Sequence, residues 1–364
     1  MRITDLPLPV RCLLLLICVV AVTAIRSHAE ASGPFTWGMT THVANTGWGR
    51  MIRLADGRWL SVGTLYPSST TNTLQLQIST DNARTWKKLS GVEEPGRRMD
   101  NGELIQLPNG TILLSGRSVI ENASFHFPVY QSKNNGATWT FLSMAETNDA
   151  VVRGNQPSQG LWEPKFFLLP HGKLGIAYAS EKHSVGTPAY SQICGERVSS
   201  DNGATWGPEI VLVSQVGGGG LRPGMPVVIP LQDGRYFEIC EVVGLDNAAV
   251  FFKISPDGVH WPSGLGTSIA MQHAGPWVAS LADGRLVVTS CSNQVSTSLD
   301  NGRTWTLSVP PAWNIGFTLS FPAIYQTGPR EIAVMNTHDG VHIRFGSFVP
   351  RKSKTKSKAA SKAE

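Results

Sequence analysis

The sequence predicts an all-β fold, and three observations support this. Charged residues make up only 16% of the 364 residues, which include 37 glycines and 11 tryptophans. Such a composition suits short strands joined by many turns and argues against a disordered or coiled-coil chain. A hairpin pattern, with apolar runs on both sides of a tight turn, recurs along the chain, and a motif that ends in tryptophan recurs in step with it. Recurrence at a fixed spacing is typical of repeat architectures.

Residues 1–29 are predicted to be a signal peptide. Arg2 and Arg11 precede the apolar run CLLLLICVVAVTAI, and small residues suited to cleavage follow near Ala29. The apolar run is shorter than the roughly 20 residues that a membrane span needs. We therefore expect a secreted or periplasmic protein with no stable membrane insertion after cleavage, and an uncleaved anchor is the alternative.

The hairpin pattern occurs in five clear copies and one weaker copy. Each copy contains a two-residue turn such as Asp-Gly or Asn-Gly between two apolar runs, which is a strong short-range signal for a β-hairpin. The copies are LADGRWLSVG at 54, LPNGTILLSG at 107, LPHGKLGIAY at 169, LQDGRYFEIC at 231, LADGRLVVTS at 281 and, more weakly, YQTGPREIAV at 325.

The tryptophan-ending motif is expected to connect the third and fourth strands of each unit. Its copies are STDNARTW at 79, SKNNGATW at 132, SSDNGATW at 199, SPDGVHW at 255 and SLDNGRTW at 298. The Asp or Asn side chain can accept bonds from turn amides, glycine tolerates a left-handed backbone, and tryptophan fills space against a neighbouring sheet. A calcium or sugar site in every copy is disfavoured because Asn134 replaces the aspartate in the second copy. The motif is therefore interpreted as a structural element.

Six such units recur at intervals of roughly 44 to 62 residues. They predict a six-bladed β-propeller over residues 33–349. The sixth unit lacks the tryptophan motif because its last strand-like segment, VHIRFGSFV, already ends at residue 349. We expect residues 33–43, GPFTWGMTTHV, to supply its fourth strand. The ring would then close and leave no open sheet edge.

The charge and the cysteines exclude several kinds of partner. The net charge of +5 comes from the chain ends, because the predicted disordered tail, residues 350–364, carries six basic residues and the body is close to neutral. A neutral body does not indicate nucleic-acid binding. The three cysteines outside the leader, Cys194, Cys240 and Cys291, form neither a disulfide framework nor a metal-ligand pattern. We expect a monomer without a metal or another cofactor.

The motifs resemble those of a known superfamily. The pattern S-x-D-x-G-x-T-W resembles the Asp-box of sialidases and related six-bladed glycosidases, and the resemblance covers residues 33–349. A closer resemblance is to the exo-arabinanases of glycoside hydrolase family 93. It is carried by LWEPKFFLLPHGKLGIAYASEKHS at 161–184, YSQICGERVSSDNGATWG at 190–207 and RPGMPVVIPLQDGRYFEICEVVG at 222–244. The resemblance implies a retaining hydrolase acting on the ends of arabinan or related glycans, with Glu163 as the nucleophile and Glu241 as the acid/base.

The repeat register independently supports this pair. Glu163 lies six residues before the leucine of the third hairpin, and Glu241 lies ten residues after the leucine of the fourth. Adjacent blades can bring both carboxyl groups to the mouth of the central funnel, and retaining hydrolysis needs two carboxyl groups about 5 to 5.5 Å apart. Glu238 is a competing candidate for the acid/base, expected to face the same side of the strand as Glu241.

Further polar and aromatic residues near the strand ends are predicted to bind the oligosaccharide or polysaccharide substrate. Asp100 and Asn101 precede the second hairpin as Glu163 precedes the third, and Arg222 is placed to orient Glu241 or to bind sugar. The predicted substrate-binding residues are Asp100, Asn101, Arg117, Arg222, Glu181, Tyr190, His273 and Trp277.

Two other functions are compatible with the sequence. An exo-sialidase needs three arginines around the sugar carboxylate, and Arg50, Arg117 and Arg222 are available for that. A propeller that only binds carbohydrate or protein is the second alternative, because the fold alone does not specify an activity.

Overall fold

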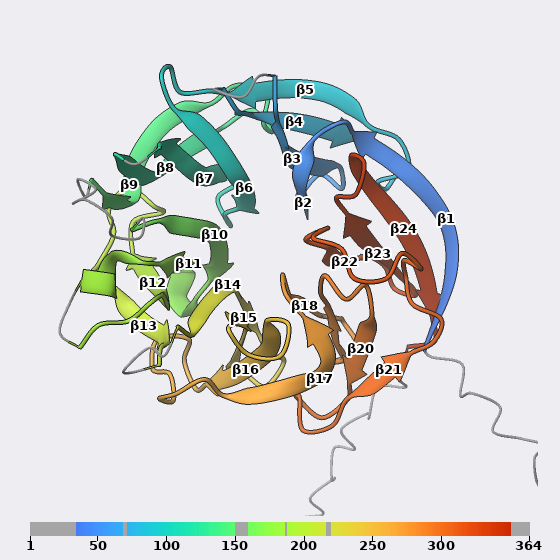
Figure 1. Ribbon diagram of the computed structural model, residues 1–364. Helices are drawn as coiled ribbons and strands as arrows, with labels where there is room; N and C mark the ends of the chain where they lie inside the picture. The colour runs from blue at the N-terminus through green and yellow to red at the C-terminus, as the bar shows by residue number, and fades with distance from the viewer. Residues whose placement is uncertain are drawn as a thin grey trace, which may run out of the picture.

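The computed structural model describes residues 34–350, apart from 68–70, 122, 150–158, 186–187 and 216–219. The predicted signal peptide and residues 351–364 of the predicted tail lie outside the described residues. Six antiparallel sheets of four strands stand around a central axis (Figure 1). The prediction of an all-β, six-bladed propeller is confirmed.

The first three blades follow one another along the chain, each with its innermost strand first. Blade 1 contains β2 (Gly47–Arg53), β3 (Trp59–Leu65), β4 (Thr73–Ser79) and β5 (Lys87–Val92). Blade 2 contains β6 (Arg98–Gln106), β7 (Ile112–Ile120), β8 (Ser124–Ser132) and β9 (Thr140–Asn148). Blade 3 contains β10 (Leu161–Leu168), β11 (Leu174–Ser180), β12 (Ile193–Ser199) and β13 (Ile210–Val213), with short 3₁₀ turns at η2 (Pro170–Gly172) and η3 (Lys182–Val185).

The last three blades continue the same order. Blade 4 contains β14 (Arg222–Pro230), β15 (Tyr236–Val243), β16 (Ala249–Ser255) and β17 (Thr267–His273). Blade 5 contains β18 (Trp277–Ser280), β19 (Leu286–Thr289), β20 (Val295–Ser298) and β21 (Thr306–Ser308). Blade 6 contains β22 (Ala323–Gly328), β23 (Glu331–Asn336), β24 (Val341–Phe348) and β1 (Phe35–Ala44). No helix in the described part of the chain is long and apolar enough to cross a membrane.

The N-terminal strand closes the ring, as the missing sixth motif predicted. In Figure 1 the blue β1 runs along the red β24, and the two strands pair antiparallel from Phe35 opposite Phe348 to Ala44 opposite Val341. Phe35 is buried against Phe348, and the Trp37 indole donates a hydrogen bond to the Pro310 carbonyl at 2.8 Å. Strands from opposite ends of the chain therefore share one blade.

The tryptophan-ending motifs form the turns between the third and fourth strands. At residues 199–206, the Asp201 carboxylate accepts bonds from the hydroxyl of Ser199 and from the backbone and side chain of Thr205. Gly203 has a φ of +87°. The Trp206 indole donates to Ser143 Oγ of blade 2 at 3.1 Å, so the turn also ties its blade to the preceding one.

Each blade places one residue with a left-handed backbone at the start of its innermost strand. These residues are Trp48, Asn101, Glu163, Met225, Gly275 and Phe321, with φ between +42° and +54°. In the first four blades this residue lies at a β-bulge, where the pairing with the second strand slips. A bulge bends the strand and redirects a side chain, so in these four blades one position is turned out of the regular alternation at the inner rim of the ring.

Candidate active site

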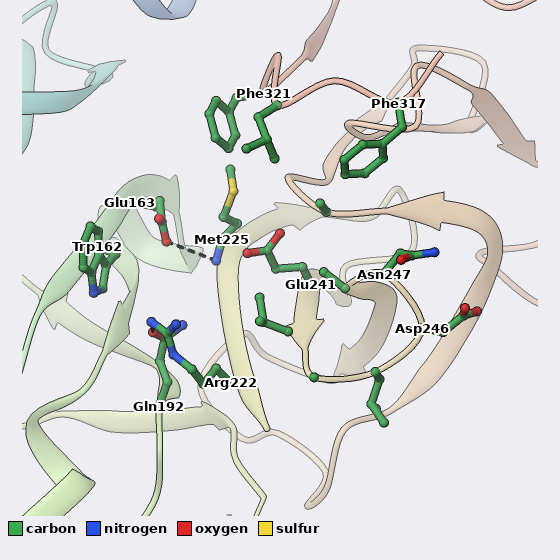
Figure 2. A pocket seen from close by; sticks show the side chains of 16 residues that line it. Trp162, Glu163, Gln192, Arg222, Met225, Glu241, Asp246, Asn247, Phe317 and Phe321 are labelled. Carbon is green, nitrogen blue, oxygen red and sulfur yellow. Dashed lines mark hydrogen bonds between the residues drawn. The ribbon is translucent and has the colours of Figure 1, made fainter. Parts of the chain in front are cut away.

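A pocket of about 670 Å³ opens among blades 3 to 6 and contains both predicted catalytic residues (Figure 2). Its walls come from the starts of β10 and β14, the end of β15 with the loop after it, and the segment before β22. The lining residues are Trp162, Glu163, Gln192, Arg222, Met225, Glu241, Val243, Gly244, Leu245, Asp246, Asn247, Ala248, Ala274, Phe317, Leu319 and Phe321. Concave pockets with a few convergent polar groups are where ligands usually bind.

Glu163 is held by the neighbouring blade. The bulge of β10 turns its side chain toward the pocket, and its Oε2 accepts a hydrogen bond from the backbone N–H of Met225 at 3.3 Å. Met225 is the left-handed residue of blade 4, so the bulge of one blade positions the carboxylate of the preceding one.

Glu241 is held in the same way, one blade further on. Its Oε2 accepts a hydrogen bond of 2.6 Å from the N–H of Gly275, the left-handed residue of blade 5. Its Oε1 lies 3.5 Å from the point where a Cβ would stand on Gly224, the residue directly before Met225. The two carboxyl groups therefore approach the same short segment of β14 and face one pocket.

Burial and nearby charges shift the pKa values of both carboxyl groups. Burial and repulsion from Glu241 raise the pKa of Glu163 to about 8. Burial also raises the pKa of Glu241, and the Gly275 N–H and the Arg222 guanidinium partly offset that effect. With a pKa of about 8, Glu163 retains most of its proton at neutral pH, because burial and the nearby Glu241 both disfavour its charged form.

Arg222 is the predicted substrate-binding residue that lies in the pocket wall. It donates to Glu181 at 2.5 Å and to the Gln192 side-chain oxygen at 2.9 Å. The buried Glu181 also accepts from the Gly160 N–H, and the Gln192 amide donates to the Pro223 carbonyl at 2.7 Å. Glu181 therefore contacts Arg222 and fixes its guanidinium. Gln192 was not predicted, because a glutamine beside a strand carries no distinctive sequence signal.

Arg117, Asp100 and Asn101 lie behind the pocket, outside its lining. The Arg117 guanidinium stacks 3.8 Å from the centre of the Trp162 ring and donates to the Leu161 carbonyl. Asp100 pairs across the strands with Arg117 and accepts from Thr64 Oγ1 and its own following N–H, that of Asn101. The structure thus places this group against Trp162, the neighbour of Glu163.

Trp277 lies below the pocket in a narrow, buried part of the ring. Its ring faces the guanidinium of Arg50 at 4.8 Å and the ammonium of Lys165 at 4.3 Å, and Lys165 pairs with Glu103 at 2.5 Å. The indole N–H donates to the Ile324 carbonyl. Trp277 therefore packs with buried charged side chains and supports the pocket from below without lining it.

The three arginines considered for a sialidase do not converge. Arg50 is buried between Trp48 and Trp277 and donates to backbone carbonyls. Arg117 is engaged with Trp162, and Arg222 alone of the three lines the pocket. The described residues therefore lack the cluster that would grip the carboxylate of sialic acid.

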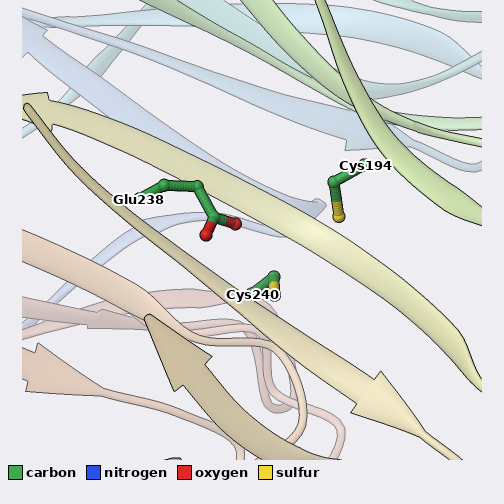
Figure 3. A group of neighbouring side chains, drawn as sticks. All are labelled: Cys194, Glu238 and Cys240. Atoms are coloured by element: carbon green, nitrogen blue, oxygen red, sulfur yellow. The ribbon is translucent and has the colours of Figure 1, made fainter. Parts of the chain in front are cut away.

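The expectation that Glu238 faces the same side as Glu241 is wrong. The two residues are three positions apart in β15, and side chains alternate between faces of a strand. Glu238 is 0% exposed and points to the interface of blades 3 and 4, close to Cys194 and Cys240 (Figure 3). Burial raises its pKa to about 8 although Lys253 lies near it.

The remaining predicted substrate-binding residues lie apart from the catalytic pair. Tyr190 is outside the lining and donates its backbone N–H to the His183 carbonyl. His273 lies in a second cavity that borders the pocket, and its ring contacts the Asp246 carbonyl at 2.9 Å. The apolar wall of Met225, Phe317, Leu319 and Phe321 was not foreseen, because single apolar residues in loops are indistinguishable from packing residues in a sequence.

Comparison with known proteins identifies similar folds. No protein-family model matches the sequence, and neither does any curated protein. An α-L-arabinanase from Penicillium chrysogenum, solved with arabinobiose, is 22% identical, with a TM-score of 0.72 over 86% of this chain and 98% of that one. The family 93 α-L-arabinofuranosidase of Fusarium graminearum, also solved with arabinobiose, is 20% identical, with a TM-score of 0.71 and the same coverage.

Sialidases share the architecture less closely. A Hadza microbial sialidase is 14% identical and matches with a TM-score of 0.59 over 85% of this chain and 66% of that one. The structural neighbours thus include the arabinan-degrading enzymes and the sialidases that the sequence motifs resemble. At these identities the likeness is one of fold.

Proposed function

We propose that the protein is a retaining glycosidase that removes sugars from the ends of arabinan or related glycans and needs no metal or other cofactor. The observation that carries the proposal is the pair of carboxyl groups, Glu163 and Glu241, which face one pocket from adjacent blades. The similarity in fold to two enzymes solved with arabinobiose supports the choice of substrate. We also propose that residues 1–29 direct export.

The two carboxyl groups divide the reaction between them. Glu163 attacks the anomeric carbon and forms a glycosyl ester while Glu241 protonates the departing glycosidic oxygen. Glu241, now ionised, then takes a proton from water as that water attacks the anomeric carbon and releases Glu163. The sugar leaves with its original anomeric configuration because the carbon is inverted twice.

Polar groups on the Glu163 side of the pocket suit the sugar that is released. Arg222 and Gln192 lie beside Trp162 there (Figure 2), and their amide and guanidinium groups can bond sugar hydroxyls while the ring contacts a sugar face. One pocket walled by several blades accommodates a chain end more readily than a chain middle.

The test starts from a screen of wild-type protein on arabino-, sialo- and other oligosaccharides. Glu163→Gln and Glu241→Gln are each expected to lower turnover of the active substrate by a factor of about 10³ or more, since each removes a group that acts in the transition state. Unchanged hydrolysis by both variants would refute the assignment. Failure of the wild-type protein on every glycan would favour a binding propeller.

Azide rescue separates the two roles. With an activated aryl glycoside, azide added to Glu241→Ala should give a glycosyl azide of retained configuration. Azide added to Glu163→Ala should give the inverted azide, because the small anion replaces the missing nucleophile directly. The opposite pattern of products would exchange the two assignments.

A further inference from the structure

A second cavity of about 420 Å³ borders the candidate active site. Asn247 and Phe317 belong to the walls of both spaces, so the two are neighbours across these side chains. The second cavity is lined by Asn247, Met271, His273, Ser292, Gln294, Gly316 and Phe317. Its volume falls within the range of pockets that hold small organic molecules.

The combined site is divided by chemistry. In Figure 2, Trp162, Gln192 and Arg222 lie on one side of Glu241, whereas Phe317 and Asn247 lie on the other. The second side carries large apolar groups that face solvent. Met271 and Phe317, which line the second cavity, are 57% and 56% exposed, and Leu319, which lines the first pocket with Phe317, is 66% exposed. Exposed apolar groups gathered at one place usually mark a binding surface.

These apolar side chains are held in place. Asn293, which is buried, donates its side-chain amide to the Gly316 carbonyl at 2.6 Å and to Thr318 Oγ1 at 3.2 Å. The Thr318 N–H donates to the Cys291 carbonyl. The segment that carries Phe317 and Leu319 is therefore fixed before any ligand arrives, which lowers the entropic cost of binding.

The opposite wall is also fixed, at some conformational cost. Met271 has a left-handed backbone with a φ of +65°, and Asp246, Asn247 and Ala248 follow one another at positive φ. Such conformations are uncommon outside glycine and occur often at ligand sites. The His273 ring, against the Asp246 carbonyl, connects the two segments.

We propose that Met271, Phe317 and Leu319 form a leaving-group subsite for an aromatic aglycone, so that the natural substrate class includes aryl glycosides. This rests on the proposed function, in which Glu241 protonates the departing oxygen and the leaving group lies on its far side from Glu163. An aromatic ring covers the apolar wall, and its phenolic oxygen meets Glu241. The next sugar of a glycan would use the polar residues of the same cavity, such as Asn247, His273 and Gln294, whereas an aromatic aglycone would use Met271 and Phe317.

The first experiment measures the subsite without catalysis. Binding of 2-naphthol, a free aromatic alcohol, is followed by saturation-transfer NMR on wild-type protein and on Phe317→Ala and Met271→Ala. We expect at least a fivefold weaker affinity in each variant, and recovery in Phe317→Trp. Phe141→Ala is the matched control, because Phe141 is 57% exposed on blade 2 and lies outside both cavities.

The second experiment measures specificity. The 2-naphthyl glycoside and the disaccharide of the released sugar are compared as substrates. Phe317→Ala is expected to lower kcat/KM about tenfold or more on the naphthyl glycoside, because it removes the apolar surface that the ring buries. Because Phe317 also lines the catalytic pocket, kcat/KM on the disaccharide should fall as well, but by a clearly smaller factor than on the naphthyl glycoside, and Phe141→Ala should change neither.

The outcomes separate the subsite from the proposed function. If glycosides are hydrolysed and Phe317→Ala lowers kcat/KM by the same factor on both substrates, the aryl subsite is refuted and the proposed function stands. If no glycoside is hydrolysed but 2-naphthol binds in a Phe317-dependent way, the function is refuted and the aromatic site stands. Naphthol binding that is the same in all variants, or absent, refutes the subsite.

Discussion

At the scale of residues, the two candidate catalytic carboxyl groups experience opposing effects on their charge. Each carboxylate accepts a backbone N–H from the next blade, which favours the ionised form, while burial favours the neutral form. Hydrolysis needs Glu163 ionised and Glu241 protonated, and the raised pKa of Glu163 means that only part of the protein is in this state at neutral pH.

The pair predicts the pH dependence of hydrolysis. Glu163 attacks only as a carboxylate, and its pKa is raised to about 8, so activity should rise as the pH rises toward 8. Glu241, whose pKa is also raised by burial, supplies its proton only while it is protonated, so activity should fall again at higher pH. The measurement is kcat/KM from pH 4 to 10. A rate that has already reached its maximum at pH 5 would contradict the raised pKa of Glu163.

A single substitution tests the repulsion between the two groups. In Glu241→Gln the coulombic effect on Glu163 is absent, so the pKa of Glu163 should fall below its value in the wild-type protein. With a dinitrophenyl glycoside, whose departure needs no acid, the rate should rise with pH to a plateau and have its midpoint below 8. A midpoint at or above 8 would show that burial alone sets this pKa.

Glu238 allows a stability prediction at the same scale. Its pKa is raised to about 8 in the folded state, and an unfolded glutamate titrates near 4.5. The folded protein therefore binds this proton more tightly, and the stability present below pH 4.5 is lost as the pH rises through about 8. Glu238→Gln removes this loss. The difference in melting temperature, variant minus wild type, should therefore be more positive at pH 8.5 than at pH 5.

The exposed Glu93 provides the comparison for that experiment. Glu93→Gln should shift the melting temperature by similar amounts at both pH values. If Glu238→Gln also shows a pH-independent shift, the buried carboxyl group does not carry the predicted proton.

At the scale of elements, the starts of the innermost strands act as holders for catalytic groups. The N–H of Gly275 binds Glu241, and a Cβ on Gly275 would lie 2.7 Å from Cys291 Sγ and 3.1 Å from the Phe321 ring. Such contacts force a shift of the backbone, and Gly275 also has a φ of +49°. Only glycine meets both conditions without strain.

Gly275→Ala is therefore expected to lower kcat/KM about tenfold or more by displacing Glu241, since small misplacements of a catalytic group are costly. The variant should remain folded by circular dichroism. Adding Cys291→Ala removes the closest obstructing atom and should recover part of the activity. Wild-type activity in the single variant would show that the N–H of Gly275 does not position the acid.

The sequence predicted these elements well where the repeat is regular. Hairpin turns and tryptophan motifs recur with spacing that periodicity reveals, and the same register located Glu163 and Glu241. The apolar wall of Phe317 and Leu319 comes from the connection between β21 and β22, which no repeat constrains. Arg117 was predicted to bind the substrate, but its side chain stacks on Trp162 and lies outside the pocket. This contact joins two blades, so it cannot be inferred from the position of Arg117 in its own strand.

At the scale of the whole molecule, one strand completes the ring. β1 covers the outer edge of β24, and β24 would otherwise present unpaired backbone groups to other chains. Phe35 and Trp37 attach that strand to blade 6 and to the segment before it.

Removal of residues 1–44 is expected to lower the melting temperature by about 10 °C or more and to cause self-association, because the edge of β24 becomes a template for pairing. Light scattering and thermal denaturation measure both effects. Removal of residues 1–33 alone leaves β1 intact and should change neither. A monomeric, equally stable protein after the longer deletion would contradict closure by β1.

The six left-handed positions around the rim have a consequence for how such a molecule can change. Each blade has one residue at an equivalent place. These residues are two aromatic residues, an asparagine, a glutamate, a methionine and a glycine. Several of these places touch one another, because Gly275 lies beside Phe321 and the Phe321 ring packs against that of Trp48. An exchange at one blade therefore has to be accommodated by its neighbours, so new chemistry at the rim requires changes at adjacent positions together.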